Sequence, residues 1–476
     1  MRFKDEHLFL SPSDLANYLA CPYLSTLEAE VARDKRPKPH PRDDIAQLVA
    51  EKGDLHEAEY LAKLREEGHE VVEIGLDGLD FEDAARKTEQ AMRSGAQVIY
   101  QATFARDGWR GLADFVIRVD ESSGLGAWSY EAWDTKLARS AKPAAVLQLV
   151  FYSQEIGLIQ GRLPEWLHVV PGTGVVETYR PADFDAFFRT AQQRLRTHLE
   201  SPPDLYAWPC DHCSRCDFIP VCAQRWRDDD HLTLVASIRR DQIERLNGVG
   251  VDTLAGLAVV PAELKVERLA APMLDRLRDQ ASLQLHRRDT GELTRHLLEP
   301  VEKKGFGLLP PPSPGDVFFD MEGDPFFEPA NQLEFLFGLL TQSGGETEYT
   351  AIRANDRESE RRAFEQFIDL VDARLAEYPD LHVYHYASYE PSTLARLMGA
   401  HATREEEVDE LLRGEVFVDL LQVVRQSLRA GVPNYSLKSI EQFFFTRSAS
   451  VKSGDDAVVA FERYLATGGE TLLTDI

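Results

Sequence analysis

Five cysteines are the residues whose type and spacing point most directly to chemistry. Cys210, Cys213, Cys216 and Cys222 crowd into one short stretch, and Cys21 stands alone near the start of the chain. The spacing Cys213-x2-Cys216-x5-Cys222 leaves Cys21 as the natural fourth thiolate of an iron-sulfur cluster or a zinc site. Cys210-x2-Cys213 is a competing register, and packing of reduced cysteines is a third alternative. A split four-thiolate site would tie the two ends of one domain together.

A second pattern lies between these cysteines, on the extended run 129–138. Asp134 and Lys136 are two residues apart and therefore project from the same strand face. A carboxylate binds Mg²⁺, while a neighbouring lysine orients or helps deprotonate a water and offsets charge on the phosphate. Asp114, on the run 111–119, would add a carboxylate, and His56 would complete the ligand set. By itself, the Asp-x-Lys pattern is more typical of a solvated strand face.

A third pattern, VFFDMEGDP, begins at residue 317. Asp320 and Glu322 share a strand face there, which suits a site that holds two metal ions. Glu390 follows at an expected helix start, and Asp419 lies further on. Acidic residues at strand ends and helix starts are also commonplace without any catalytic role.

The surrounding pattern predicts the elements that position these residues. A short helix capped by Ser11 or Ser13 carries Cys21 at its end, and a long amphipathic helix runs from 44 to about 67 with His56 on it. Strands at 111–119 and 129–138, a helix at 147–158 and a strand and turn at 163–174 follow. These elements predict an α/β module.

Beyond the last cysteine the pattern becomes helical and then α/β again. Gly248-Val249-Gly250 separates two helical stretches in a helix-hairpin-helix pattern, whose backbone amides are expected to contact DNA phosphates. A proline-rich joint then marks a boundary. We expect four segments: a nuclease-like domain at 1–230, a helical region at 231–307, a linker at 308–315 and a second α/β domain at 316–476.

From about residue 8 to 230, the series resembles the RecB-type, iron-sulfur branch of the PD-(D/E)XK nuclease superfamily, with its restriction-endonuclease-like core. It runs from His56 through Asp114, Asp134-x-Lys136 and Gln148-x3-Tyr152, bracketed by Cys21 and the C-x2-C-x5-C group. The resemblance implies a structural 4Fe-4S cluster on Cys21, Cys213, Cys216 and Cys222. It implies Mg²⁺ or Mn²⁺ on His56, Asp114 and Asp134, a catalytic Lys136, and substrate-facing Gln148 and Tyr152. For Gln148 and Tyr152, simple packing of a helix on the sheet is an equal alternative.

The segment from 316 resembles the RNase H-like fold in its DEDD-type 3′-5′ exonuclease form. Asp320, Glu322 and Glu390 match its first acidic positions. Such relatives continue to a Tyr or His followed four residues later by a last Asp, and no such motif follows Asp419 before Thr474-Asp475-Ile476. We therefore expect an incomplete second site, a structural role for Asp419, and a longer intact protein that continues into a helicase.

Composition limits the class of protein. The 476 residues carry a formal charge of −27 and are 43% hydrophobic, as in an ordinary globular protein of several domains. No apolar stretch suits a membrane span and no signal peptide is evident, so we expect a cytoplasmic protein with reduced thiols. The charge opposes indiscriminate binding to polyanions, so any contact with nucleic acid must be local.

These patterns favour a metal-dependent DNA nuclease of repair or recombination, with exonuclease action on single strands or ends. Two alternatives stay open. One is a non-catalytic DNA-binding scaffold of a larger helicase-nuclease, and the other is an exonuclease that acts only through residues 313 onward.

Overall fold

The computed structural model spans the chain and describes all residues except 5, 40–43, 77, 79, 329–330, 344, 446–450, 452, 470 and 476, and the side chains of 343, 474 and 475. The chain forms two compact units. The first comprises Met1–Pro220 with Pro325–Asn331, and the second comprises Val221–Asp324 with Gln332–Ile476. The division between the units falls inside helix α7 (Ile219–Asp228).

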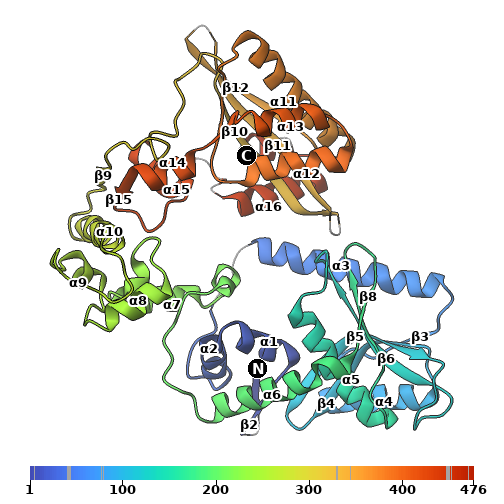
Figure 1. Ribbon diagram of the computed structural model, residues 1–476. Coiled ribbons are helices and arrows are strands. Elements are labelled where there is room, and N and C mark those ends of the chain that lie inside the picture. Colours follow the sequence, from blue (N-terminus) through green and yellow to red (C-terminus); the bar gives the residue numbers. More distant parts are fainter. Residues whose placement is uncertain are drawn as a thin grey trace. The chain divides into compact units, whose positions relative to one another are not determined.

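The first unit is built on a six-stranded mixed sheet in the order β3-β4-β5-β6-β7-β8 (Figure 1). The strands are β3 (Val71–Glu73), β4 (Val98–Arg106), β5 (Trp109–Val119), β6 (Ser129–Lys136), β7 (Leu167–Pro171) and β8 (Glu177–Tyr179). A hairpin of β1 (Arg2–Lys4) and β2 (His7–Phe9) precedes them. Strands β4, β5 and β6 are antiparallel neighbours, whereas β6 and β7 run parallel. The alternation at 111–119 and 129–138 thus predicts strands where the structure has them.

Helices cover both faces of this sheet. They are α1 (Pro12–Ala20), α2 (Pro22–Ala32), α3 (Asp44–Glu66), α4 (Phe81–Ser94), α5 (Pro143–Gln160) and α6 (Pro181–Glu200). Helix α5 packs with Val116 of β5 in the main core, while Leu61 and Leu64 of α3 pack with Phe115 in a second cluster. Adjacent residues of β5 point to opposite faces, so α3 and α5 cover opposite sides of the sheet.

The start of α1 follows from its sequence. Ser11 caps the helix, because its hydroxyl accepts from the amide of Asp14 while the Asp14 carboxylate accepts from the amide of Ser11. Pro22 ends α1 as expected and at the same time begins α2. Cys21 therefore sits at the joint between the two helices.

The second unit contains a five-stranded sheet in the order β12-β11-β10-β13-β14. The strands are β10 (Val317–Glu328), β11 (Asn331–Ser343), β12 (Glu346–Arg353), β13 (Val383–His385) and β14 (Phe417–Asp419). Strands β10, β13 and β14 are parallel, and β11 and β12 are antiparallel. The helices after β12 are α11 (Arg357–Glu377), α12 (Tyr389–His401), α13 (Glu405–Arg413), α14 (Leu420–Ser427), α15 (Leu437–Ile440), α16 (Gly454–Thr467) and α17 (Thr471–Asp475).

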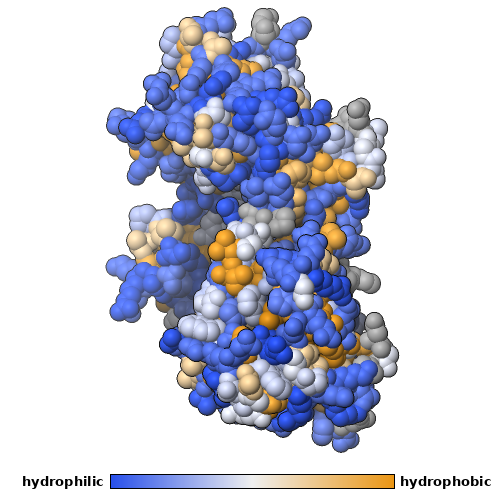
Figure 2. Space-filling model, turned by 90° about the vertical axis from the view of Figure 1, so that its right-hand side faces the viewer, coloured by the Kyte–Doolittle hydropathy of each residue, from blue (hydrophilic) through white to orange (hydrophobic). Residues whose placement is uncertain are grey.

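The helical region before this sheet belongs to the same compact unit. It contains α8 (Arg240–Asn247), α9 (Leu254–Ala258) and α10 (Ala271–Thr290), with Gly250 at a positive φ of 79° between α8 and α9. A two-stranded sheet of β9 (Arg295–Leu297) and β15 (Leu428–Ala430) joins this region to the segment after α14. The described part of the chain contains no helix long and apolar enough to cross a membrane, and Figure 2 shows a mostly hydrophilic face.

The close packing of β5 on α5 generates a stability prediction. A Cβ on Gly111 would lie 2.8 Å from a ring carbon of Tyr152, so Gly111→Ala should lower the free energy of unfolding by about 1–3 kcal/mol. Gly53, within α3, has open space at its Cβ position, so Gly53→Ala should raise it by up to about 1 kcal/mol. Urea titration followed by tryptophan fluorescence measures both. If Gly111→Ala has the same free energy of unfolding as wild type, that result would contradict the close packing of β5 on α5.

Candidate catalytic and metal-binding sites

Asp114, Asp134 and Lys136 meet where β5 and β6 part. The ladder between the strands ends at the pair Phe115 and Trp133, and beyond it Thr135 donates its amide and hydroxyl to Oδ2 of Asp114, at 2.8 and 3.0 Å. Lys136 Nζ lies 2.5 Å from Oδ2 of Asp134, whose side chain is fully buried. The two carboxylates and the ammonium group therefore form one charged cluster at the edge of a regular ladder.

Burial sets the electrostatics of this cluster. Burial, followed by the charge of Asp114, raises the pKa of Asp134 well above its usual range, and Lys136 opposes that shift. Burial acts to lower the pKa of Lys136, but the charges of Asp134 and Asp114 outweigh it and leave the pKa raised. Two neighbouring carboxylates of this kind are a suitable donor set for a hard divalent cation, which would relieve their repulsion.

Gln148 and Tyr152 approach this cluster from α5. The Gln148 side-chain amide lies 3.4 Å from Oδ1 of Asp134 and 3.4 Å from the Tyr152 hydroxyl. Tyr152 is buried in the main core, and its hydroxyl donates to the carbonyl of Leu112. Gln148 thus contacts a carboxylate of the cluster, whereas Tyr152 packs in the core between α5 and the sheet.

His56 is buried on α3, and its Nε2 lies 3.3 Å from the carbonyl oxygen of Val170. Val170 pairs with Thr135 across β6 and β7, next to Asp134. In the described structure His56 has no hydrogen bond to either carboxylate. A ring that donates one N–H to a backbone carbonyl keeps its other nitrogen for a metal, which is the usual arrangement of a histidine ligand.

Glu57 is a member of this cluster that the sequence pattern did not predict. Burial and the charge of Asp114 raise its pKa, and it also contributes to the field at Lys136. Gln101 contacts its carboxylate at 3.4 Å. A signal was present, because Glu57 lies four residues before Leu61 and thus on the apolar face of α3. An acidic side chain on a buried helix face needs a partner.

Cys210 lies next to two other cysteines of the first unit, Cys21 and Cys213. Its Sγ lies 3.8 Å from that of Cys213, and its amide donates to the Cys213 sulfur at 3.3 Å. Burial raises the pKa of the Cys21 thiol, and the charge of Cys210 and its hydrogen bond add to that shift. Burial raises the pKa of Cys216 too, with a contribution from Cys213. Both Cys21 and Cys213 are thus within reach of Cys210, which agrees with the competing Cys210-x2-Cys213 register as well as with a Cys210 that lies beside the ligand set.

The separation of the Cys210 and Cys213 sulfur atoms suits two arrangements. A sulfur separation of 3.8 Å fits a direct thiol contact, and also the edge of a tetrahedral zinc site with Zn–S of about 2.3 Å. Cys222 lies on α7, in the second unit. None of the five cysteines forms a disulfide bond, and the described residues contain no group of three or more His, Cys, Asp or Glu side chains arranged to hold a metal ion.

In the second unit, Asp320 and Glu322 lie on β10, the central strand. Asp320 is exposed and Glu322 half-buried, whereas Val317, Phe319 and Met321 are in the core, as the alternation predicts. Asp324, further along, is fully buried. A Cβ on Gly454, at the start of α16, would lie 3.5 Å from Oε2 of Glu322. The start of that helix therefore faces this carboxylate.

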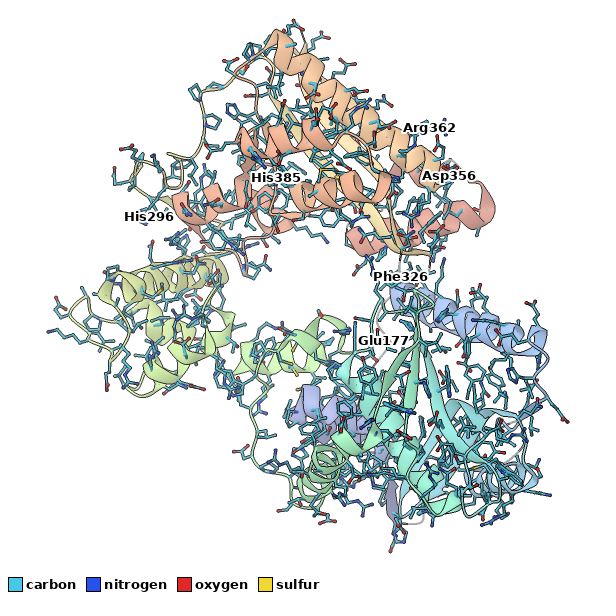
Figure 3. The ribbon with its side chains drawn as sticks, turned by 45° about the vertical axis from the view of Figure 1, so that its right-hand side comes forward. Glu177, His296, Phe326, Asp356, Arg362 and His385 are labelled. Atoms are coloured by element: carbon cyan, nitrogen blue, oxygen red, sulfur yellow. The ribbon has the colours of Figure 1, made fainter. Side chains whose placement is uncertain are left out.

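Glu390 is buried in the first turn of α12. Its Oε2 lies 3.5 Å from Nδ1 of His385, which Figure 3 labels. Asp419 caps α14, because its Oδ1 accepts from the amide of Leu421. The same oxygen accepts from the amide of Ala387, a residue with a positive φ of 79° in the turn before Glu390. Asp419 thus has the structural role expected for it, and it fixes the turn that carries Glu390.

A buried network that the sequence pattern also did not predict connects α12 to β11, next to Gly323 of β10. Glu334 is fully buried, and its carboxylate accepts from Arg396, from Gln332 at 2.7 Å and from the Tyr389 hydroxyl at 3.0 Å. A Cβ on Gly323 would overlap Oε2 of Glu334 and would lie 2.7 Å from the Tyr389 hydroxyl. Gly323 follows Glu322, and Tyr389 precedes Glu390, so this network holds the two acidic positions in register.

Of the other predicted positions, Gly248, Val249 and Gly250 lie between α8 and α9, with Val249 exposed. The side chains of Thr474, Asp475 and Ile476 lie outside the described part of the structure, and the expected absence of a last catalytic carboxylate stays a prediction.

Comparison with known families gives one match. Residues 317–476 match the family model described as the RNase_H superfamily. The five-stranded sheet, with three parallel strands and an antiparallel pair, is formed by residues of the same segment. This part of the chain is an RNase H-like domain. A search of curated proteins gave no match. The match covers about a third of the chain and is consistent with a nuclease-type hydrolase.

The Glu334 network generates a prediction. Glu334→Ala should destabilise the RNase H-like domain by about 2–4 kcal/mol, because it leaves Arg396 and the Tyr389 hydroxyl without their buried acceptor. Hydrogen-deuterium exchange of β11 and α12 amides measures the effect. Glu358→Gln removes an exposed carboxylate that pairs with Arg361 on α11 and should change stability by less than about 0.5 kcal/mol. Equal protection in both variants would show that the network is not important for stability.

Proposed function

We propose that the protein is a metal-dependent nuclease that hydrolyses DNA phosphodiester bonds in repair, recombination or end processing. The observation that carries the proposal is the RNase H-like domain with Asp320 and Glu322 on its central strand. The cluster of Asp114, Asp134 and Lys136 in the first unit supports a second, RecB-like catalytic site. Single strands or DNA ends are the proposed substrates.

At the first site, each residue has a role that follows from its contacts. A divalent cation, Mg²⁺ or Mn²⁺, held by Asp114, Asp134 and His56, would polarise the phosphate and make a bound water more acidic. Thr135 fixes the orientation of Asp114, and Gln148 contacts Asp134. Lys136 remains protonated beside Asp134 and so offsets negative charge that develops on the phosphate.

At the second site, Asp320 and Glu322 would hold the metal ions and Glu390 would join them. The buried Glu334 network keeps the start of α12 against the strand, and Asp419 fixes the preceding turn. Glu334 and Asp419 act as positioning residues, since each carboxylate is occupied by donors of the protein itself.

The first test measures Mg²⁺-dependent cleavage of an end-labelled single-stranded oligonucleotide by the full chain. Asp134→Asn and Lys136→Gln should each lower the cleavage that depends on the first unit by about 100-fold or more, because each removes charge at the reacting phosphate. Asp183→Asn, an exposed carboxylate at the start of α6, is the matched control and should cleave as wild type does. An RNA of the same sequence tests the preference for DNA.

The double variant Asp320→Asn/Glu322→Gln separates the two sites. A second candidate function, an exonuclease that acts only through the RNase H-like domain, is favoured by the family match to that segment alone. This candidate predicts that the double variant loses all cleavage and that Asp134→Asn cleaves as wild type does. If the wild-type protein cleaves the oligonucleotide with neither Mg²⁺ nor Mn²⁺, that result would instead favour a non-catalytic DNA-binding scaffold.

We also propose that the cysteines hold a 4Fe-4S cluster on Cys21, Cys213, Cys216 and Cys222. Iron and acid-labile sulfide in anaerobically purified protein should be stoichiometric in the wild type, with a visible absorption band. Cys213→Ser should lose most of both, because it removes a thiolate ligand. Cys210→Ser should retain them. Loss in Cys210→Ser would place Cys210 in the ligand set, and stoichiometric zinc without sulfide would overturn the cluster.

A further inference from the structure

Two adjoining cavities in the second unit lie between α10, the segment after β9, and the junction of α14 and β15. Their volumes are about 510 and 470 Å³, and both are lined by Arg276, Leu298 and Arg429. Lys304 and Arg425 also line the larger one. Four cationic side chains therefore face one hollow in a chain whose formal charge is −27.

In the described part of the chain, Arg276, Arg425, Arg429 and Lys304 form no ion pair. Arg429 Nη1 donates to the carbonyls of Leu428 and Arg425, at 2.7 and 3.0 Å, and its buried Nε has no acceptor among the described residues. Burial, followed by the charge of Arg429, lowers the pKa of Arg276, which shows how closely the positive groups gather.

Among the described residues, the acidic side chains that line the cavities form no ion pair with the four cations. Asp275 pairs with Arg278 at 2.7 Å, and Asp279 pairs with His296 (Figure 3) at 3.0 Å. Glu299 lines the larger cavity but is exposed and forms no ion pair with the described arginines. In the smaller cavity, Asp275 is thus paired with an arginine outside the group of four, and Asp279 accepts a hydrogen bond from a histidine ring.

The frame of the cavities is built by buried contacts. Gln280 of α10 donates to the carbonyl of Ala430 and accepts from the Tyr435 hydroxyl, at 2.8 and 2.6 Å. Gly305 donates to the Gln426 side chain at 3.0 Å, and its Cβ position lies 2.9 Å from the Gln426 backbone. These contacts fix the arginine-bearing elements before any ligand binds.

Gathering guanidinium groups without counter-charges is unfavourable unless an anion occupies the space between them. Guanidinium groups bind phosphate oxygens through paired hydrogen bonds, which suits a tetrahedral dianion or a phosphodiester. We propose that this cavity binds phosphate groups of the nucleic-acid backbone and so anchors the substrate strand on the second unit. The nucleic-acid assignment rests on the nuclease function proposed above.

The test measures binding of a fluorescein-labelled single-stranded oligonucleotide in EDTA, which separates binding from cleavage. Arg276→Gln/Arg425→Gln should raise Kd at least about five-fold. It should also reduce the slope of log K against log salt by roughly 0.7 for each phosphate that the variant no longer neutralises. Arg413→Gln removes the same charge from an exposed arginine of α13 that pairs with Asp409, and should bind as wild type does. Arg425→Gln alone tests the same point with an exposed side chain, should the double variant unfold.

The outcomes are distinguishable. If the double variant matches Arg413→Gln in affinity and salt slope, the cavity does not bind the strand and this inference fails, while wild-type cleavage still supports the nuclease function. If inorganic phosphate raises the Tm of wild type but not of the double variant, and oligonucleotide binding is equal in both, the site takes a free anion and the nucleic-acid assignment is wrong. If wild type neither binds nor cleaves the oligonucleotide, the nuclease function fails.

Discussion

The constraint on which the first unit depends is the burial of a carboxylate beside another carboxylate. Asp134 has no exposed surface, and Asp114 adds to the cost of its charge. Lys136 on the same strand and the side-chain amide of Gln148 from α5 contact the Asp134 carboxylate and offset this cost. The amide of Thr135, beyond the end of the ladder between β5 and β6, donates to Asp114. A fold that needed only stability would place apolar residues here.

The RNase H-like domain satisfies buried charge in another way. Glu334 and Glu360 are both buried, and each accepts hydrogen bonds from neighbouring side chains: Arg396 contacts Glu334, while Arg357 and the His401 ring contact Glu360. These pairs leave Asp320 exposed on the same sheet. The buried carboxylates of the domain are thus held by hydrogen bonds, whereas Asp320 lies at the surface of the strand face proposed to bind metal ions.

Local periodicity made some of this predictable. Alternation over 111–119 and 129–138 predicted β5 and β6, and it also predicted that Asp320 and Glu322 face away from the core. Glu57 and Glu334 were not predicted, because their importance depends on which strand or helix they meet across the fold. A motif records spacing along the chain, whereas the contact of Glu334 with Arg396 joins residues 62 apart. The position of Cys210 beside Cys21 likewise required the folded chain.

The pairing of β9 with β15 has a consequence for how the protein is made. Gln280 of α10 bonds to Ala430, 150 residues later in the sequence. The partner of the helical region therefore leaves the ribosome only after all five strands of the RNase H-like sheet, which ends at Asp419, have been synthesised. Domains fold as their segments emerge, so the helical region must wait. Contacts this distant also slow folding, because a long loop must close first. During that interval α9, which precedes α10 in the sequence, already packs on this helix, and only the side of α10 that meets β15 lacks its native cover.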